Sequence, residues 1–257
     1  MVYQTYALII NKPLNIYFAG FVFFSTVCSY NFHWALTPNS IAPSQRLRWD
    51  EKHNRYHLLL SIIGLLGAGI FFFYFKEKWF YIIPSVVLTF LYSAPKTPYP
   101  FFQLLKKVAI GKTIFLSAIW TYVTAALPVL IEGSLSEKAI LFCIGQFFFI
   151  YAICILFDFR DKEDDKVDGI RSMITYFSER GVNALFFISI TIFMIMSLLL
   201  LRTGIAWPNI ILLICPSLLL ITLYKYSKRN FSDYLYYFVL DGLMMLSGLL
   251  LWIMNRF

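Results

Sequence analysis

The sequence predicts an all-α fold, a bundle of helices that crosses a membrane several times. Of the 257 residues, 60% are hydrophobic and 14% are charged, a composition typical of polytopic membrane proteins. Long apolar runs recur along the whole chain, and short polar stretches separate them. No hydrophilic stretch is long enough to form a separate soluble domain. We therefore predict one transmembrane domain over residues 1–257.

Eight of the apolar runs are predicted to be full transmembrane helices, because about twenty apolar residues in a helix cross the hydrocarbon core of a bilayer. The predicted spans are approximately 14–36, 58–75, 79–91, 108–130, 139–157, 181–201, 207–224 and 234–254. Residues 1–10 form an earlier apolar run that is too short to span, and it ends at Asn11, Lys12 and Pro13.

Lysine and arginine are unevenly divided between the two alternating sets of loops. Most of them lie in the set formed by residues 38–55, 96–107, 158–180 and 225–233. Basic loops stay on the cytoplasmic side, so we predict that these four loops face the cytosol from the inner, cytoplasmic membrane. The excess of basic over acidic residues, 22 against 14, then reflects this bias and contact with anionic headgroups of the lipid bilayer. No nucleic-acid partner is expected.

The most informative polar stretch begins at Asp158. Asp158, Asp161, Asp165 and Asp168 recur at i, i+3, i+7 and i+10, which places them on one stripe of a helix. Carboxylates on one stripe repel each other unless cations lie among them. Mg²⁺ suits such a stripe because it prefers carboxylate and phosphate oxygens. Spacing alone leaves two interpretations open: a Mg²⁺–diphosphate site, or a solvated loop in which salt bridges to the interleaved basic residues balance the charge. These basic residues are Arg160, Lys162, Lys166 and Arg171.

Two segments carry a resemblance to a known family. The pattern at Asp158, Arg160, Asp161, Asp165, Gly169 and Ser172 resembles the second aspartate-rich motif of the UbiA superfamily of intramembrane prenyltransferases. Upstream, the residues from Tyr92 to Pro95 are similar to the Tyr-Ser-x-Pro segment of that family. Its first motif, Asn-x-x-x-Asp-x-x-x-Asp, would fall on Asn31, Ala35 and Asn39, so the asparagine is kept and both aspartates are absent.

The resemblance implies a UbiA-like membrane helix bundle with a central cavity closed by loops on the cytosolic side. It also implies a Mg²⁺-dependent enzyme that transfers a prenyl group from an isoprenoid diphosphate to a lipophilic acceptor within the membrane. Because the family fold usually has nine helices, residues 1–10 are expected to be the last turns of a truncated first helix whose start is missing. The alternative is a short segment lying at the membrane interface.

The resemblance also assigns roles to residues. Asp158, Asp161 and Asp165 would be the catalytic carboxylates that hold Mg²⁺, and Asn39 could add one amide oxygen to the metal site. Basic groups would contact the diphosphate. The expected substrate-binding residues are Asn31, Arg46, Arg48, Tyr92, Arg160, Lys162 and Arg171. The histidines show no spacing typical of a metal site or a catalytic triad, so we interpret them as structural or interfacial.

A second function remains open. A non-catalytic UbiA-like membrane protein that binds an isoprenoid or a partner protein would also account for the loss of both first-motif aspartates. The complete second motif favours the enzyme instead.

Asp241, about two turns into the last predicted span, is costly there if unpaired. It either faces a polar cavity beneath the charged loops or is hydrogen-bonded or protonated between helices.

Overall fold

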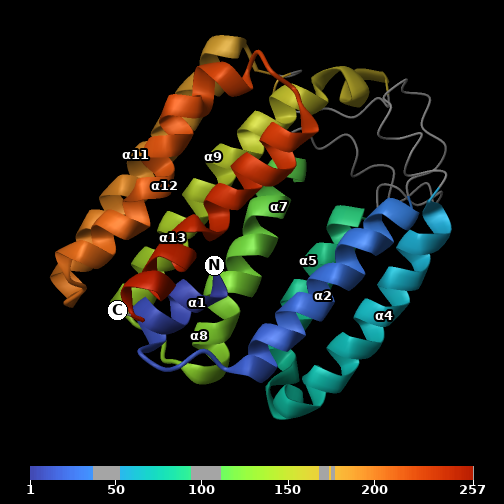
Figure 1. The fold of residues 1–257 in the computed structure, drawn as a ribbon, viewed down its shortest axis with the longest axis vertical. Helices are drawn as coiled ribbons and strands as arrows, with labels where there is room; N and C mark the ends of the chain where they lie inside the picture. Colours follow the sequence, from blue (N-terminus) through green and yellow to red (C-terminus); the bar gives the residue numbers. More distant parts are fainter. Residues whose placement is uncertain (37–52, 94–110, 168–173, 175–176, 257) are drawn as a thin grey trace. The chain divides into compact units, whose positions relative to one another are not determined.

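The computed structural model describes residues 1–36, 53–93, 111–167, 174 and 177–256, and all its regular elements in these ranges are helices. The all-α prediction is confirmed for them (Figure 1). The chain divides into two compact units, and each is described by itself. Unit 1 comprises Met1–Leu14, Thr113–Asp161 and Tyr176–Phe257, and unit 2 comprises Asn15–Lys112 and Lys162–Thr175.

The described part of unit 2 contains three long helices, α2 (Ile16–Ala35), α4 (Asn54–Phe72) and α5 (Trp79–Ser93). A 3-10 segment, η2 (Phe73–Lys78), joins α4 to α5. The start of α4 and the end of α5 both contact the C-terminal part of α2. Consequently α4 and α5 run in opposite directions (Figure 1), as expected for the two separate helices predicted at 58–75 and 79–91.

The other described helices lie wholly or mainly in unit 1. They are α1 (Val2–Thr5), η1 (Tyr6–Ile10), α7 (Gly111–Thr121), η5 (Tyr122–Ala126), α8 (Leu127–Glu132), α9 (Glu137–Val167), α11 (Glu179–Leu199), η6 (Leu200–Thr203), α12 (Trp207–Ser227), η7 (Tyr234–Leu240) and α13 (Asp241–Met254). Three of them, η1, η5 and η7, are π-helical. Because their bounds are contiguous, α7, η5 and α8 form one helix, and η7 continues directly into α13.

Helix α9 lies in the core of unit 1. Its middle part is apolar on every side, as expected for a helix surrounded by other helices, and residues such as Ile150, Ile153 and Leu156 are fully buried. Phe149 stacks on Phe193 of α11, with ring centroids 4.9 Å apart. The predicted span ended at residue 157, whereas α9 continues to Val167 and carries the start of the aspartate-rich motif with it.

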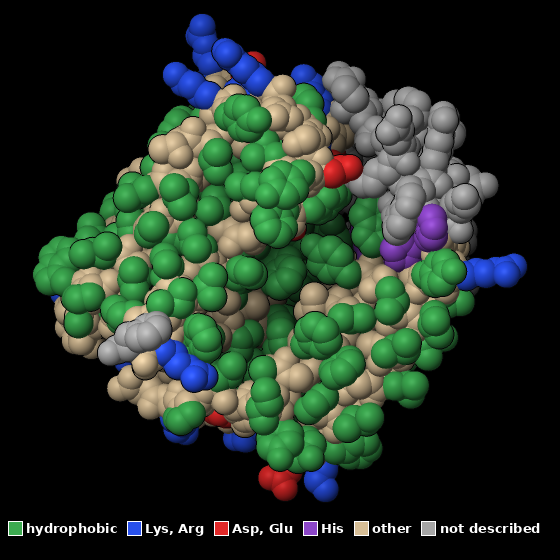
Figure 2. Space-filling view, in the orientation of Figure 1, with side chains coloured by type: hydrophobic (Ala, Val, Ile, Leu, Met, Phe, Trp, Pro, Cys, Tyr) green, Lys and Arg blue, Asp and Glu red, His purple; other side chains and the backbone are tan. Residues whose placement is uncertain are grey.

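Among the described residues, six helical segments are long and apolar enough to cross a membrane, which indicates an integral membrane protein. They are Asn54–Ser93, Thr113–Glu132, Glu137–Lys162, Glu179–Thr203, Trp207–Ser227 and Tyr234–Met254. Figure 2 shows hydrophobic side chains over most of the visible face, with lysines and arginines at its margins. Exposed apolar side chains such as Leu65 and Leu66 suit contact with lipid.

The predicted total of eight full spans and one truncated helix is not confirmed. Helix α2 is not among the six segments, since Ser29, Asn31 and His33 reduce the hydropathy of its last turns. The predicted truncated helix corresponds to α1 and η1, which end where Asn11 adopts a left-handed conformation. Within unit 1 this segment is partly buried, and its Thr5 hydroxyl donates to the carbonyl of Thr124 at 2.7 Å.

Candidate functional site

The aspartate-rich motif occupies the C-terminal turns of α9. The helix is continuous from Glu137 to Val167, so positions 158, 161 and 165 share one stripe of it, as predicted. The structure describes side chains on this helix as far as Lys162, which is half-buried. The Asp165 side chain lies outside the described residues, as do Asp168 and Arg171. The roles predicted for these residues stay predictions.

Asp158 is held by a residue from another helix. The Thr113 hydroxyl on α7 donates a hydrogen bond to Asp158 Oδ2 at 2.6 Å. Thr113 is 2% exposed and Asp158 is 3% exposed. A carboxylate in such an environment is stable only when it is hydrogen-bonded, because burial removes its water. The contact therefore fixes the orientation of the first motif carboxylate.

Arg160 is also buried, with 8% of its side chain exposed. Its Nε donates to Asp161 Oδ1 at 2.8 Å, and its Nη2 donates to the Tyr237 hydroxyl at 3.0 Å. The guanidinium carbon lies 4.9 Å from the ring centroid of Phe157, 5.1 Å from that of Tyr236 and 4.6 Å from that of Tyr237. These contacts attach the motif to η7, since both tyrosines lie on that segment.

The third guanidinium nitrogen of Arg160, Nη1, is buried and has no hydrogen-bond partner among the described residues. Asp241, the first residue of α13, is half-buried and interacts electrostatically with Arg160. The carboxyl group of Asp241 therefore has a cationic neighbour on α9.

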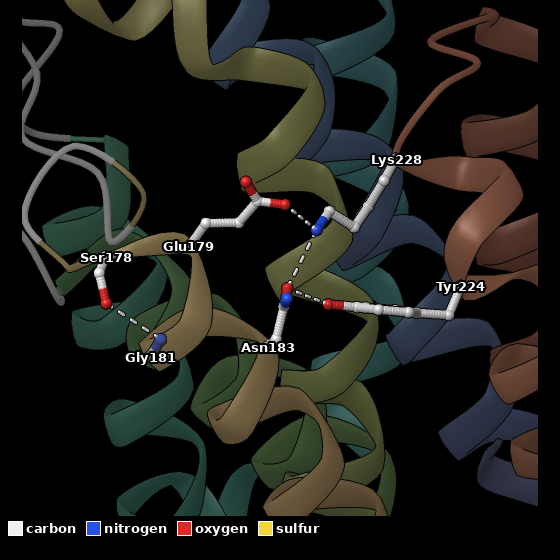
Figure 3. Close-up of polar contacts among 6 residues, drawn as sticks. All are labelled: Ser178, Glu179, Gly181, Asn183, Tyr224 and Lys228. Carbon is white, nitrogen blue, oxygen red and sulfur yellow. Dashed lines mark hydrogen bonds and ion pairs between the residues drawn. The ribbon is translucent and has the colours of Figure 1, made fainter.

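A second cation lies on another side of the motif. The Lys228 ammonium at the end of α12 pairs with the Glu179 carboxylate and donates to Asn183 Oδ1 at 3.0 Å. The Tyr224 hydroxyl donates to the same amide oxygen (Figure 3). Lys228 Nζ also lies 4.5 Å from the ring centroid of Phe159, the residue between Asp158 and Arg160. Sequence reasoning placed Lys228 in a basic loop and did not predict this cluster.

In unit 2, histidines contact two of the predicted substrate-binding residues. Asn31 Nδ2 donates to the carbonyl of Val27 at 2.8 Å, and Asn31 Oδ1 lies 2.9 Å from His57 Nδ1. The Tyr92 ring stacks on His33 with centroids 4.8 Å apart. His33 Nδ1 lies 3.3 Å from the Ser93 hydroxyl oxygen. These contacts support the interpretation of both histidines as structural.

The sequence model of the UbiA prenyltransferase family matches residues 35–246. The chain belongs to this family. Searches of curated proteins and of solved structures found no match. Proteins of this family are in general prenyltransferases. Membership therefore supports transferase activity, isoprenoid substrates and a lipid environment for this chain.

Members of the UbiA family typically use Mg²⁺. In the part of the chain whose side chains are described, no group of three or more His, Cys, Asp or Glu residues is close enough to hold one ion. The donor chemistry nevertheless fits, because Asp158 and Asp161 present carboxylates one turn apart and carboxylate oxygens suit Mg²⁺. The first-motif residue Asn39 and the loop residues Arg46 and Arg48 lie outside the described residues.

Proposed function

We propose that this UbiA family member transfers a prenyl group from an isoprenoid diphosphate to a lipophilic acceptor within the membrane, in a Mg²⁺-dependent reaction. The observation that carries the proposal is the motif on α9. Three aspartate positions share one stripe of this helix, and the side chains of Asp158 and Asp161 are fixed by Thr113 and Arg160. Family membership supports the reaction class.

The difficult step in such a reaction is the departure of diphosphate, because charge separates in an apolar environment. Asp158, Asp161 and Asp165 would hold Mg²⁺, with Asn39 adding an amide oxygen. When bound, Mg²⁺ supplies positive charge to the leaving diphosphate oxygens.

Protein cations would complete the neutralisation of the diphosphate. Arg160 offers a buried NH2 group, that of Nη1, which lacks a hydrogen-bond partner among the described residues. Lys162, a half-buried residue, adds an ammonium group, and Arg171, Arg46 and Arg48 are proposed to bind the same anion. Hydrophobic helices around such a site exclude water, which protects an allylic carbocation from hydrolysis.

Asn31 and Tyr92 are proposed to bind substrate as parts of the other two family segments. His57 and His33 limit the freedom of these side chains before any ligand binds. A side chain that is already ordered loses less conformational entropy on binding. For orientation, we propose that the basic loops face the cytosol, in agreement with the distribution of lysine and arginine.

The function is tested by measuring diphosphate release. Purified protein in detergent is supplied with isoprenoid diphosphates of several lengths, a set of lipophilic acceptors, and Mg²⁺ or a chelator. Asp161→Asn and Asp165→Asn should each lower the Mg²⁺-dependent rate by at least about a hundredfold, because changes even to outer partners of metal ligands typically cost roughly ten- to a hundredfold. Asp164→Asn, off the stripe by register, is the matched control. Equal rates for all variants would contradict the proposal.

A non-catalytic role in binding an isoprenoid or a partner protein is the second candidate. It is favoured by Ala35, which has no metal ligand where the family has aspartate, and by Asn31, whose amide is already hydrogen-bonded. In that case an isoprenoid would bind without turnover. Calorimetry would then give the same affinity for the wild type and for Asp161→Asn, with or without Mg²⁺.

A further inference from the structure

The two described carboxylates of the motif both depend on hydroxyl groups from elsewhere in unit 1. Thr113 on α7 donates directly to Asp158. The Tyr237 hydroxyl on η7 accepts from Arg160, which in turn donates to Asp161. Neither Thr113 nor Tyr237 belongs to the aspartate-rich motif, and no functional role was predicted for either from the sequence.

The Thr113 hydroxyl donates to a charged acceptor, the carboxylate of Asp158. Many buried serines and threonines in membrane helices satisfy their hydroxyl by donating to a carbonyl of the same helix, one turn earlier. Ser117, Ser189, Ser217 and Ser227 all do so here. Thr5 and Ser247 donate to other elements, but to neutral oxygens. Thr113 also donates to another helix, and its acceptor is a carboxylate. A bond to a charged acceptor in a buried location is stronger than a neutral one, so this contact strongly restricts the Asp158 rotamer.

Tyr237 acts on Asp161 through a rigid intermediate. The guanidinium group of Arg160 is planar, so fixing Nη2 on the Tyr237 hydroxyl also fixes the direction in which Nε points. Rings from both α9 and η7 enclose this plane. The π-helical form of η7 matters here, because a π-helix has more residues per turn and consecutive residues diverge less around its axis. Tyr236 and Tyr237 can therefore both reach the same guanidinium.

We propose that Thr113 and Tyr237 are positioning residues that orient the Asp158 and Asp161 carboxylates for metal binding, and this inference rests on the proposed function. Preorganised ligands bind a metal more tightly because they lose less freedom when the ion arrives. The two hydroxyl groups would therefore influence metal affinity more than the stability of the metal-free protein.

The test removes each hydroxyl while keeping the shape of the side chain. Thr113→Val and Tyr237→Phe are the test variants, and Thr113→Ser restores a hydroxyl at the first position. The matched controls are Thr191→Val, whose hydroxyl bonds within its own helix, and Tyr234→Phe, on the exposed side of η7. Each protein is purified in detergent and titrated with Mn²⁺ by electron paramagnetic resonance. Diphosphate release is measured against Mg²⁺ concentration, and thermal unfolding is measured without metal.

Thr113→Val and Tyr237→Phe should each weaken Mn²⁺ binding by roughly tenfold, the lower end of the range for partners of metal ligands. The Mg²⁺ concentration for half-maximal diphosphate release should rise by a similar factor. Thr113→Ser should recover most of the affinity, and both controls should match the wild type. Unchanged Mn²⁺ affinity in both test variants would overturn the positioning role, even if their metal-free unfolding temperatures fall. A wild-type protein that binds no Mn²⁺ and releases no diphosphate would overturn the proposed function, and the positioning role with it.

Discussion

The close approach of α2 and α4 in unit 2 predicts a sharp difference between two glycine substitutions. A Cβ added to Gly64 would lie 2.4 Å from the backbone nitrogen of Cys28 and 2.8 Å from the carbonyl oxygen of Phe24. Backbone atoms cannot rotate away, so Gly64→Ala must push the two helices apart. A Cβ added to Gly69 would meet nothing within 4 Å, so Gly69→Ala is a control on the same helix.

The expected magnitude follows from two opposing effects. Overpacking of a tight contact typically costs about 1–3 kcal/mol. Alanine is about 1 kcal/mol better than glycine inside a helix. Gly64→Ala should therefore destabilise the protein by up to about 2 kcal/mol, whereas Gly69→Ala should be neutral or stabilising by up to about 1 kcal/mol. For a chain of this size, 1 kcal/mol corresponds to roughly 2–4 °C in the unfolding midpoint.

Thermal unfolding in detergent, followed by intrinsic tryptophan fluorescence, measures this difference. Gly67→Ala provides an intermediate case, because its Cβ would lie 2.3 Å from Cδ1 of the Phe24 ring, a side chain that can move. The expected order of midpoints is Gly69→Ala highest, then Gly67→Ala, then Gly64→Ala. An unfolding midpoint for Gly64→Ala at or above that of Gly69→Ala would refute the close approach of the helices at this point.

Two further predictions concern unit 1. Lys228→Met keeps the approximate length of the side chain and removes its charge, so the contacts with Glu179 and Asn183 are lost. The thermal unfolding midpoint should therefore fall by a few degrees. Lys225→Met, at an exposed position, is the control and should leave the midpoint unchanged. For topology, Arg229→Cys in a cysteine-free background should react with an impermeant thiol reagent after cells are opened, and Leu135→Cys should react in intact cells. The reverse labelling pattern would contradict the proposed orientation.

Much of the fold could be predicted from hydropathy, because a long apolar run that can cross a membrane is a local property of the sequence. The predicted bounds 234–254 coincide with η7 and α13, and the predicted start at Trp207 coincides with the start of α12, where Pro208 suits the first turn. The stripe of aspartates was also predicted to be helical, and α9 includes its first three positions.

The count of spans was harder to predict, because it depends on borderline segments. Helix α2 carries polar residues near its end, and Asn31 and His33 have partners on α4 and α5 that hydropathy does not consider. The π-helical form of η7 was also not predicted. π-Helices are rare and occur mostly as short segments, frequently at functional sites. In this segment Tyr236 and Tyr237 both contact Arg160.

The role of Arg160 shows most clearly what a motif leaves undetermined. The resemblance implied contact with diphosphate, whereas two of the three guanidinium nitrogens are bonded to Asp161 and Tyr237. Both roles are compatible because the three nitrogens of a guanidinium group donate in different directions. A cation that holds Asp161 and also keeps Nη1 available would place a donor group beside the proposed metal ligands at no further entropic cost. The register between α9 and η7 determines that arrangement, and register between helices is a tertiary property that the spacing of residues along one helix does not contain.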